Sequence, residues 1–133
     1  MRKGLSFIRR AVKDFELARR YSNSREYLTA STLYRMATEK ALKALIVRKK
    51  NSRLPKNATI EYLAMQANLP ENLYDEITNM PDEMTEMLEE EGLQEYDDGE
   101  HSHLAVRSEY RGALSKRESV RKLLDYARAT TTL

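Results

Sequence analysis

Apolar residues recur at every third or fourth position along most of the chain, which is the spacing of one face of an α-helix. The first stripe predicts a helix over residues 5–21, with one face formed by Leu5, Ile8, Val12, Phe15 and either Ala18 or Arg19. The strongest stripe predicts a helix over residues 26–50, and its apolar positions are Ala30, Leu33, Tyr34, Ala37, Ala41, Leu42, Ala44, Leu45 and Ile46. Because alanine side chains let another helix approach closely, we expect this helix to be the central packing element.

Polar residues and prolines predict where the helices begin and end. Asn23 and Glu26 have the spacing of a capping box, which predicts the start of the second helix. The cations of residues 48–50 suit the negative end of a helix dipole and predict its end. A capping box formed by Ser115 and Glu118 predicts the start of the last helix, whose apolar stripe is Val120, Leu123, Leu124 and Ala127.

Two shorter apolar stripes lie between these long helices. The first predicts a helix that starts at Asn57 or Ala58, with an apolar side of Ile60, Leu63, Ala64 and Ala67. The second starts at Pro70, is interrupted at Met80-Pro81 and ends at Gly92, so it predicts two short helices or one kinked helix. Its apolar positions are Leu73, Ile77, Met80, Met84, Met87 and Leu88. The methionines suit either the core or an adaptable partner groove, and we favour the core.

The elements together predict an all-α fold, an antiparallel helical bundle of about five helices in a single domain over residues 1–133. The chain has 133 residues with only four Gly and three Pro, which favours helices over a turn-rich β fold. It has no Cys, which excludes disulfides, a thiol nucleophile and a Cys-based zinc site. No apolar run of about 18 residues and no signal-peptide block is present, so we expect a cytoplasmic protein without membrane spans.

Charge is distributed unevenly along the chain. Residues 1–57 hold sixteen Lys or Arg against four Asp or Glu, residues 58–100 hold none against fourteen, and residues 101–133 hold seven against three. We favour the interpretation that the basic and acidic segments pair with each other, within one chain or across a homodimer. The pattern also fits a nucleic-acid-binding surface beside an acidic flank. A basic edge of the first helix, formed by Arg9, Arg10, Lys13, Arg19 and Arg20, suits a solvated face or a phosphate backbone.

Residues 37–46 read Ala-Thr-Glu-Lys-Ala-Leu-Lys-Ala-Leu-Ile, and this string resembles the second helix of HEPN domains. The resemblance extends more loosely to residues 14–18 and to the closing helix, so it touches most of the chain. It implies an antiparallel helical bundle tied to nucleotide and RNA biology, commonly dimeric. It also implies, as a possible partner, a small nucleotidyltransferase in a toxin-antitoxin pair.

Many members of that family are metal-independent ribonucleases that carry an Arg, four to six further residues and then a His. The sequence departs from this pattern. The matching places after Arg107 and after Arg111 hold no His, and neither His101 nor His103 follows an Arg at that distance. Without an imidazole to move protons near neutral pH, no catalytic residue is assigned and enzymatic activity is not expected. A divergent ribonuclease remains the alternative.

Arg107, Tyr110 and Arg111 remain near the expected site, and we interpret them as a nucleotide- or RNA-binding group. Two guanidinium groups can hold a phosphate and a tyrosine ring can stack on a base. His101 and His103 beside Asp97, Asp98 and Glu100 have donor types that bind divalent metals, but we favour a plain surface loop. Neither a metal nor a cofactor is therefore expected, and no glycine-rich phosphate loop is present.

Overall fold

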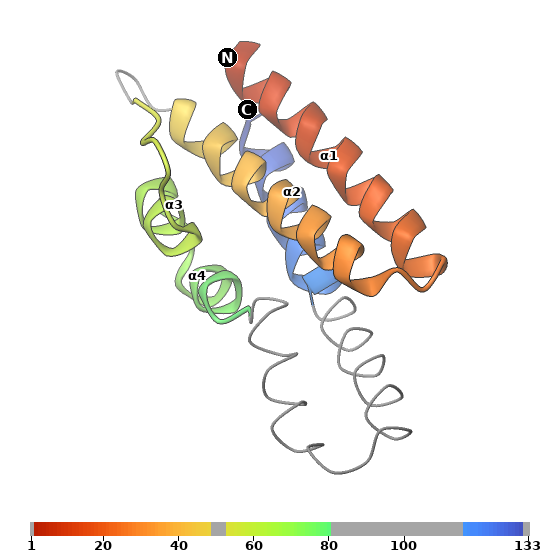
Figure 1. Ribbon diagram of the computed structural model, residues 1–133. Coiled ribbons are helices and arrows are strands. Elements are labelled where there is room, and N and C mark those ends of the chain that lie inside the picture. The colour runs from red at the N-terminus through yellow and green to blue at the C-terminus, as the bar shows by residue number, and fades with distance from the viewer. Residues whose placement is uncertain (1, 49–52, 81–115, 132–133) are drawn as a thin grey trace.

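The computed structural model describes residues 2–48, 53–80 and 116–131 (Figure 1). These residues form helices α1 (Arg2–Asn23), α2 (Tyr27–Val47), α3 (Ile60–Ala67) and α4 (Glu71–Thr78). Residues 116–131 are also helical and are called the C-terminal segment here. None of the described residues belongs to a strand. The all-α helical bundle that the apolar periodicity predicts is confirmed.

The helices pack around α2. Helix α1 returns antiparallel along one side of α2, and α3 and α4 lie on its other side (Figure 1). The C-terminal segment contacts α4 near its start, where Lys122 Nζ lies 3.1 Å from Glu76 Oε1 and the Ser119 hydroxyl donates to the same oxygen at 3.2 Å. Its other end reaches the start of α1, so both ends of the described chain lie at the same end of the bundle.

Helix α2 contributes the largest share of the core, as its alanine-rich stripe predicts. Its apolar side chains with no exposed surface are Ala30, Tyr34, Ala37, Ala41, Leu42 and Ala44. The predicted apolar positions of the last helix are buried as well, namely Val120, Leu123, Leu124 and Ala127. These residues form one continuous cluster with α1 and α3, which is how the bundle removes its apolar surface from water.

The prediction that Leu5 lies in the core is wrong, because 38% of its surface is exposed. The buried row of α1 runs instead through Gly4, Ile8, Ala11, Phe15 and Ala18. At Gly4 the helices approach so closely that a Cβ atom would lie 3.2 Å from Thr131 Cγ2 and 3.5 Å from the carbonyl oxygen of Ala44. Because only a small residue fits at this close approach, Gly4 faces the core and its neighbour Leu5 faces solvent.

The predicted capping box at Asn23 and Glu26 is also wrong. Helix α1 continues to Asn23, and Glu26 precedes α2 without a side-chain capping bond. Arg25 adopts a left-handed conformation with φ of 64°, and the backbone N–H of Glu26 donates to the carbonyl oxygen of Tyr21 at 2.9 Å. The turn therefore satisfies the last carbonyls of α1 through backbone donors, a typical C-terminal helix ending.

The remaining helix ends are close to those predicted where the structure describes them. Helix α2 ends at Val47, and α3 starts at Ile60 because the Thr59 hydroxyl accepts from the backbone N–H of Tyr62 at 3.1 Å. Helix α4 begins after Pro70, as predicted. The predicted positions Met84, Met87 and Ser115 lie outside the described residues. In the parts of the chain that the structure describes, no helix has both the length and the apolar character needed to cross a membrane.

The tight packing of α2 predicts that it does not tolerate larger side chains. Ala41→Leu adds three carbon atoms at a position with no exposed surface, and overpacking of this kind costs about 1–3 kcal/mol. Thr29→Leu, at an exposed position of the same helix, is the matched control. Urea unfolding of both variants measures the difference, and equal stability of the two would contradict the packing described here.

Candidate functional site

The predicted binding residues Arg107, Tyr110 and Arg111 lie outside the described residues, as do His101 and His103. Their roles therefore stay predictions. The described residues that flank this part of the chain are Met80 and Lys116, and Lys116 follows Arg111 by five positions in the sequence. Lys116 is thus the described residue that lies nearest in sequence to the predicted site.

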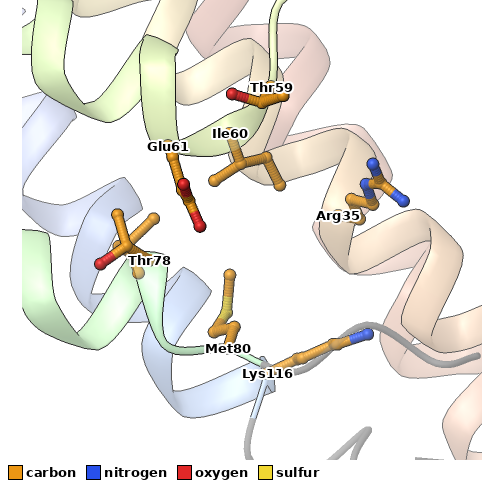
Figure 2. Close-up of a pocket in the computed structure, with 8 residues that line it drawn as sticks. Arg35, Thr59, Ile60, Glu61, Thr78, Met80 and Lys116 are labelled. Carbon is orange, nitrogen blue, oxygen red and sulfur yellow. The ribbon is translucent and has the colours of Figure 1, made fainter. Parts of the chain in front are cut away.

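Met80 and Lys116 line the same pocket, which has a volume of about 260 Å³ (Figure 2). It lies where α2, α3, α4 and the C-terminal segment meet, and its other lining residues are Arg35, Thr59, Ile60, Glu61, Ile77 and Thr78. Pockets that enclose whole drug-sized molecules usually measure about 300–1,000 Å³. This pocket is therefore suited to one small group of a ligand rather than to an extended molecule.

The pocket combines an apolar floor with charged groups at its edge. Ile60, Glu61 and Met80 extend into it, and the cationic side chains of Arg35 and Lys116 lie on one side (Figure 2). The lining residue Ile77 is buried. The hydroxyl of Thr78 is already engaged, because it donates to the carbonyl oxygen of Tyr74 at 2.8 Å. The polar groups of the pocket are therefore mainly its ionic side chains.

Two cations and one carboxylate determine the electrostatics of this pocket. Arg35 shares its charge with Glu39 on the same helix, at 3.8 Å between Arg35 Nε and Glu39 Oε1. Lys116 is buried, with 2% of its surface exposed. Such an arrangement can hold an anionic or hydrogen-bond-accepting group beside an apolar surface. Both histidines of the chain lie outside the described residues, and the described residues that line the pocket include no imidazole for proton transfer.

The described residues provide no metal site. No group of three or more His, Asp or Glu side chains that could hold a metal ion occurs in residues 2–48, 53–80 and 116–131. The acidic and histidine-containing stretch around residues 97–103, for which a metal was weighed against a plain loop, lies outside these ranges. The expectation that no metal or cofactor is bound therefore stays a prediction.

The segment 37–46, which carries the resemblance to HEPN domains, has a structural role in the hairpin of α1 and α2. Lys40 Nζ lies 2.5 Å from Asp14 Oδ2, and this ion pair joins α2 to α1. Both side chains are mostly buried, with 26% and 15% of their surface exposed. Partial burial reduces screening by solvent, so this pair holds the two helices in register better than a surface pair does.

Tyr34 is the largest fully buried side chain of the core, and its ring packs on Phe15 at 5.6 Å between centroids. Its hydroxyl has no hydrogen-bond partner within the described structure. Burial raises the pKa of the Tyr34 phenol; the cations Arg117 and Arg19 oppose this increase, and Glu16 adds to it. The hydroxyl therefore stays protonated over the physiological range.

Sequence reasoning did not identify the pocket. Its residues come from four separate segments. Ile60, Ile77 and Met80 belong to predicted apolar stripes and Lys116 lies within a predicted capping box, but these are ordinary helix patterns and none of them predicts a pocket. Glu61 and Thr59 look like an ordinary helix start, where a hydroxyl and an acidic residue are common. A weak signal was available, since both ends of the stretch between Met80 and Lys116 belong to predicted helices that must pack together.

Comparison with protein families gives one match. A model described as the HEPN domain matches residues 5–132, which is nearly the whole chain. No curated protein and no solved structure matches the chain. The match covers α1 from its fourth residue onward, α2 to α4, the C-terminal segment and the predicted residues Arg107, Tyr110 and Arg111. The resemblance drawn from residues 37–46 is thereby confirmed.

The buried phenol of Tyr34 gives a prediction for stability against pH. Tyr34→Phe removes an unpaired buried hydroxyl, so stability at pH 7 is expected to stay equal or to increase by about 1 kcal/mol. The folded-state pKa of Tyr34 is raised above its unfolded value of 10.0. The wild-type protein should therefore lose stability as the pH rises above that value, and the variant should avoid this part of the loss.

Urea unfolding of both proteins at pH 7 and at alkaline pH measures the two effects. The advantage of the Phe variant should grow with pH. A loss of more than about 1 kcal/mol at pH 7 would instead mean that the hydroxyl makes a hydrogen bond that the described structure does not contain.

Proposed function

The chain belongs to the HEPN domain family, and on this basis we propose that it binds RNA or a nucleotide without cleaving RNA by itself. The observation that carries the proposal is the family match over residues 5–132 combined with the sequence around Arg107 and Arg111, which keeps cations but lacks the His of the ribonuclease pattern. Binding needs cations and stacking groups, whereas cleavage also needs a group that transfers protons. The sequence keeps the cations and the aromatic ring but lacks the histidine that would transfer protons.

Arg107, Tyr110 and Arg111 form the proposed binding group. Arginine presents a planar fork of donors that matches a phosphate, and tyrosine offers a ring on which a base can stack. The pocket at Lys116 supports this choice, because it adds cationic side chains and an apolar surface a few residues further along the chain. Its volume of about 260 Å³ suits a single group of a nucleotide better than a longer stretch of RNA.

The proposal includes the biological setting that the family resemblance implies. The chain, taken as one domain over residues 1–133, would act in the cytoplasm as a homodimer, with a nucleotidyltransferase as cognate partner in a toxin-antitoxin pair. A structural homodimer is the main alternative without a ligand, because the basic residues 1–57 and the acidic residues 58–100 can join across an interface. Sedimentation at low and high salt distinguishes these cases from a monomer.

Binding is tested with a short single-stranded RNA and with ATP, each at two salt concentrations. Arg107→Ala combined with Arg111→Ala is expected to weaken binding about tenfold or more, because two charge-assisted contacts are lost. Arg53→Ala combined with Arg121→Ala removes the same charge from exposed positions elsewhere and should leave affinity nearly unchanged. If neither ligand binds the wild-type protein, alone or with a candidate partner, the proposal is wrong.

A cleavage assay distinguishes binding from catalysis. The wild-type protein is expected to leave a labelled RNA intact at pH 7, since no His stands at the required distance from Arg107 or Arg111. The variants Arg111→Ala and His103→Ala serve as controls for contaminating nucleases. Cleavage by the wild-type protein that disappears in either variant would establish the alternative, a divergent ribonuclease that uses a loop histidine.

A further inference from the structure

The outward face of α1 carries a row of cations. Arg9, Arg10, Lys13 and Arg20, called the α1 basic face here, are all exposed. They project from the side of the helix opposite to its buried row, and α1 lies at the edge of the bundle (Figure 1). The row therefore faces solvent rather than another described helix.

Among the described residues these cations have no acidic partner, and the acids of α1 pair with other cations. Asp14 pairs with Lys40 of α2, and Glu16 pairs with Arg19 at 3.6 Å. In the described structure none of the four cations of the α1 basic face forms an ion pair. A concentration of unneutralised positive charge on one side of a small domain attracts polyanions and raises their local concentration.

Three of the four cations, Arg9, Arg10 and Lys13, line an open, shallow hollow of about 520 Å³ together with Leu5 and Ser6. The guanidinium carbon of Arg10 lies 5.9 Å from the centroid of the Phe7 ring, a cation–π contact that restrains the plane of the guanidinium group. Leu5 adds exposed apolar surface. The hollow thus combines fixed positive charge, a planar stacking group and an apolar wall.

We propose that the α1 basic face binds the phosphate backbone of single-stranded RNA. The helical rise places Arg9 and Lys13 about 6 Å apart along the axis and Arg20 about 10 Å further on, so the cations can follow successive phosphates of an extended strand. The plane of Arg10 and the side chain of Leu5 offer contacts for a base, which a simple polyanion would not use. The inference rests on the proposed function and adds a second surface to it, separate from Arg107, Tyr110 and Arg111.

The same charges suit an anionic membrane less well. A helix that lies on a lipid surface inserts an apolar face between the head groups. The apolar face of α1 is occupied by the core, where Ala11 and Ala18 have no exposed surface and Phe15 is 8% exposed. The solvent side of α1 is mainly charged, and its exposed large apolar residues are Leu5 and Leu17, at 38% and 40%. A strand of phosphates is the partner that uses this charge.

The experiment compares the salt dependence of RNA binding for three proteins. The wild type is measured by fluorescence anisotropy with a labelled oligouridine between about 50 and 200 mM salt. The test variant combines Arg9→Ala, Lys13→Ala and Arg20→Ala. The control combines Arg53→Ala, Lys56→Ala and Arg121→Ala, which removes the same charge from exposed positions outside α1. Circular dichroism confirms that each variant is folded.

Each phosphate contact on a single strand contributes about 0.7 to the slope of log K against log salt. Loss of three contacts should therefore reduce the magnitude of this slope by about 2. The control should keep the slope of the wild type. If the test variant does not fold, the single variants Arg9→Ala and Lys13→Ala replace it, each with an expected decrease of about 0.7.

Four outcomes would overturn the inference. A test variant that keeps the wild-type slope would exclude the α1 basic face while leaving the proposed function intact, whereas a wild type that binds no RNA would end both. Binding to vesicles with anionic lipids without binding to RNA would assign the face to a membrane. A change of sedimentation mass in the test variant with unchanged RNA affinity would assign it to a contact between copies of the chain.

Discussion

The close approach of α1 to the alanine face of α2 is the constraint on which the rest of the bundle depends. Ala37, Ala41 and Ala44 have no exposed surface, and Gly4 occupies a place where even a methyl group is crowded. Because the backbones are near one another, the partly buried ion pair of Lys40 and Asp14 can bridge the hairpin. That geometry also fixes the rotation of α1, which turns its apolar row inward and its cations toward solvent.

The apolar periodicity was sufficient to predict most of the fold, and the exceptions have clear physical reasons. Tyr34, Leu63, Ile77 and Leu123 lie in the core because each falls on a stripe that one helix can bury. Leu5 lies on the predicted stripe but is exposed, because Gly4 occupies the core-facing position in this turn of α1. The small size of Gly4 permits contact with Thr131. The prediction for the turn before α2 failed because the turn is formed by backbone N–H groups that donate to the last carbonyl oxygens of α1, and no side chain caps the start of α2.

The candidate site was less accessible to sequence reasoning. Lys40 and Asp14 are separated by 26 positions, so their pairing depends on the hairpin and not on local spacing. The pocket needs four segments to come together, and none of its residues has an unusual local pattern. The binding group of Arg107, Tyr110 and Arg111 came from the family resemblance. A site that is assembled from distant segments leaves little sequence signal in any one of them. A motif within a single helix can be recognised from the sequence alone.

The contact between Gly4 and Thr131 has a consequence for how the polypeptide can be connected. It brings the start of α1 and the end of the C-terminal segment within van der Waals reach of each other. A short engineered linker could join these points, and new termini could open in the exposed turn at Ser24 and Arg25 without separating any pair of packed helices. In such a circular permutant the bundle would keep its shape although α2 would become the first helix synthesised.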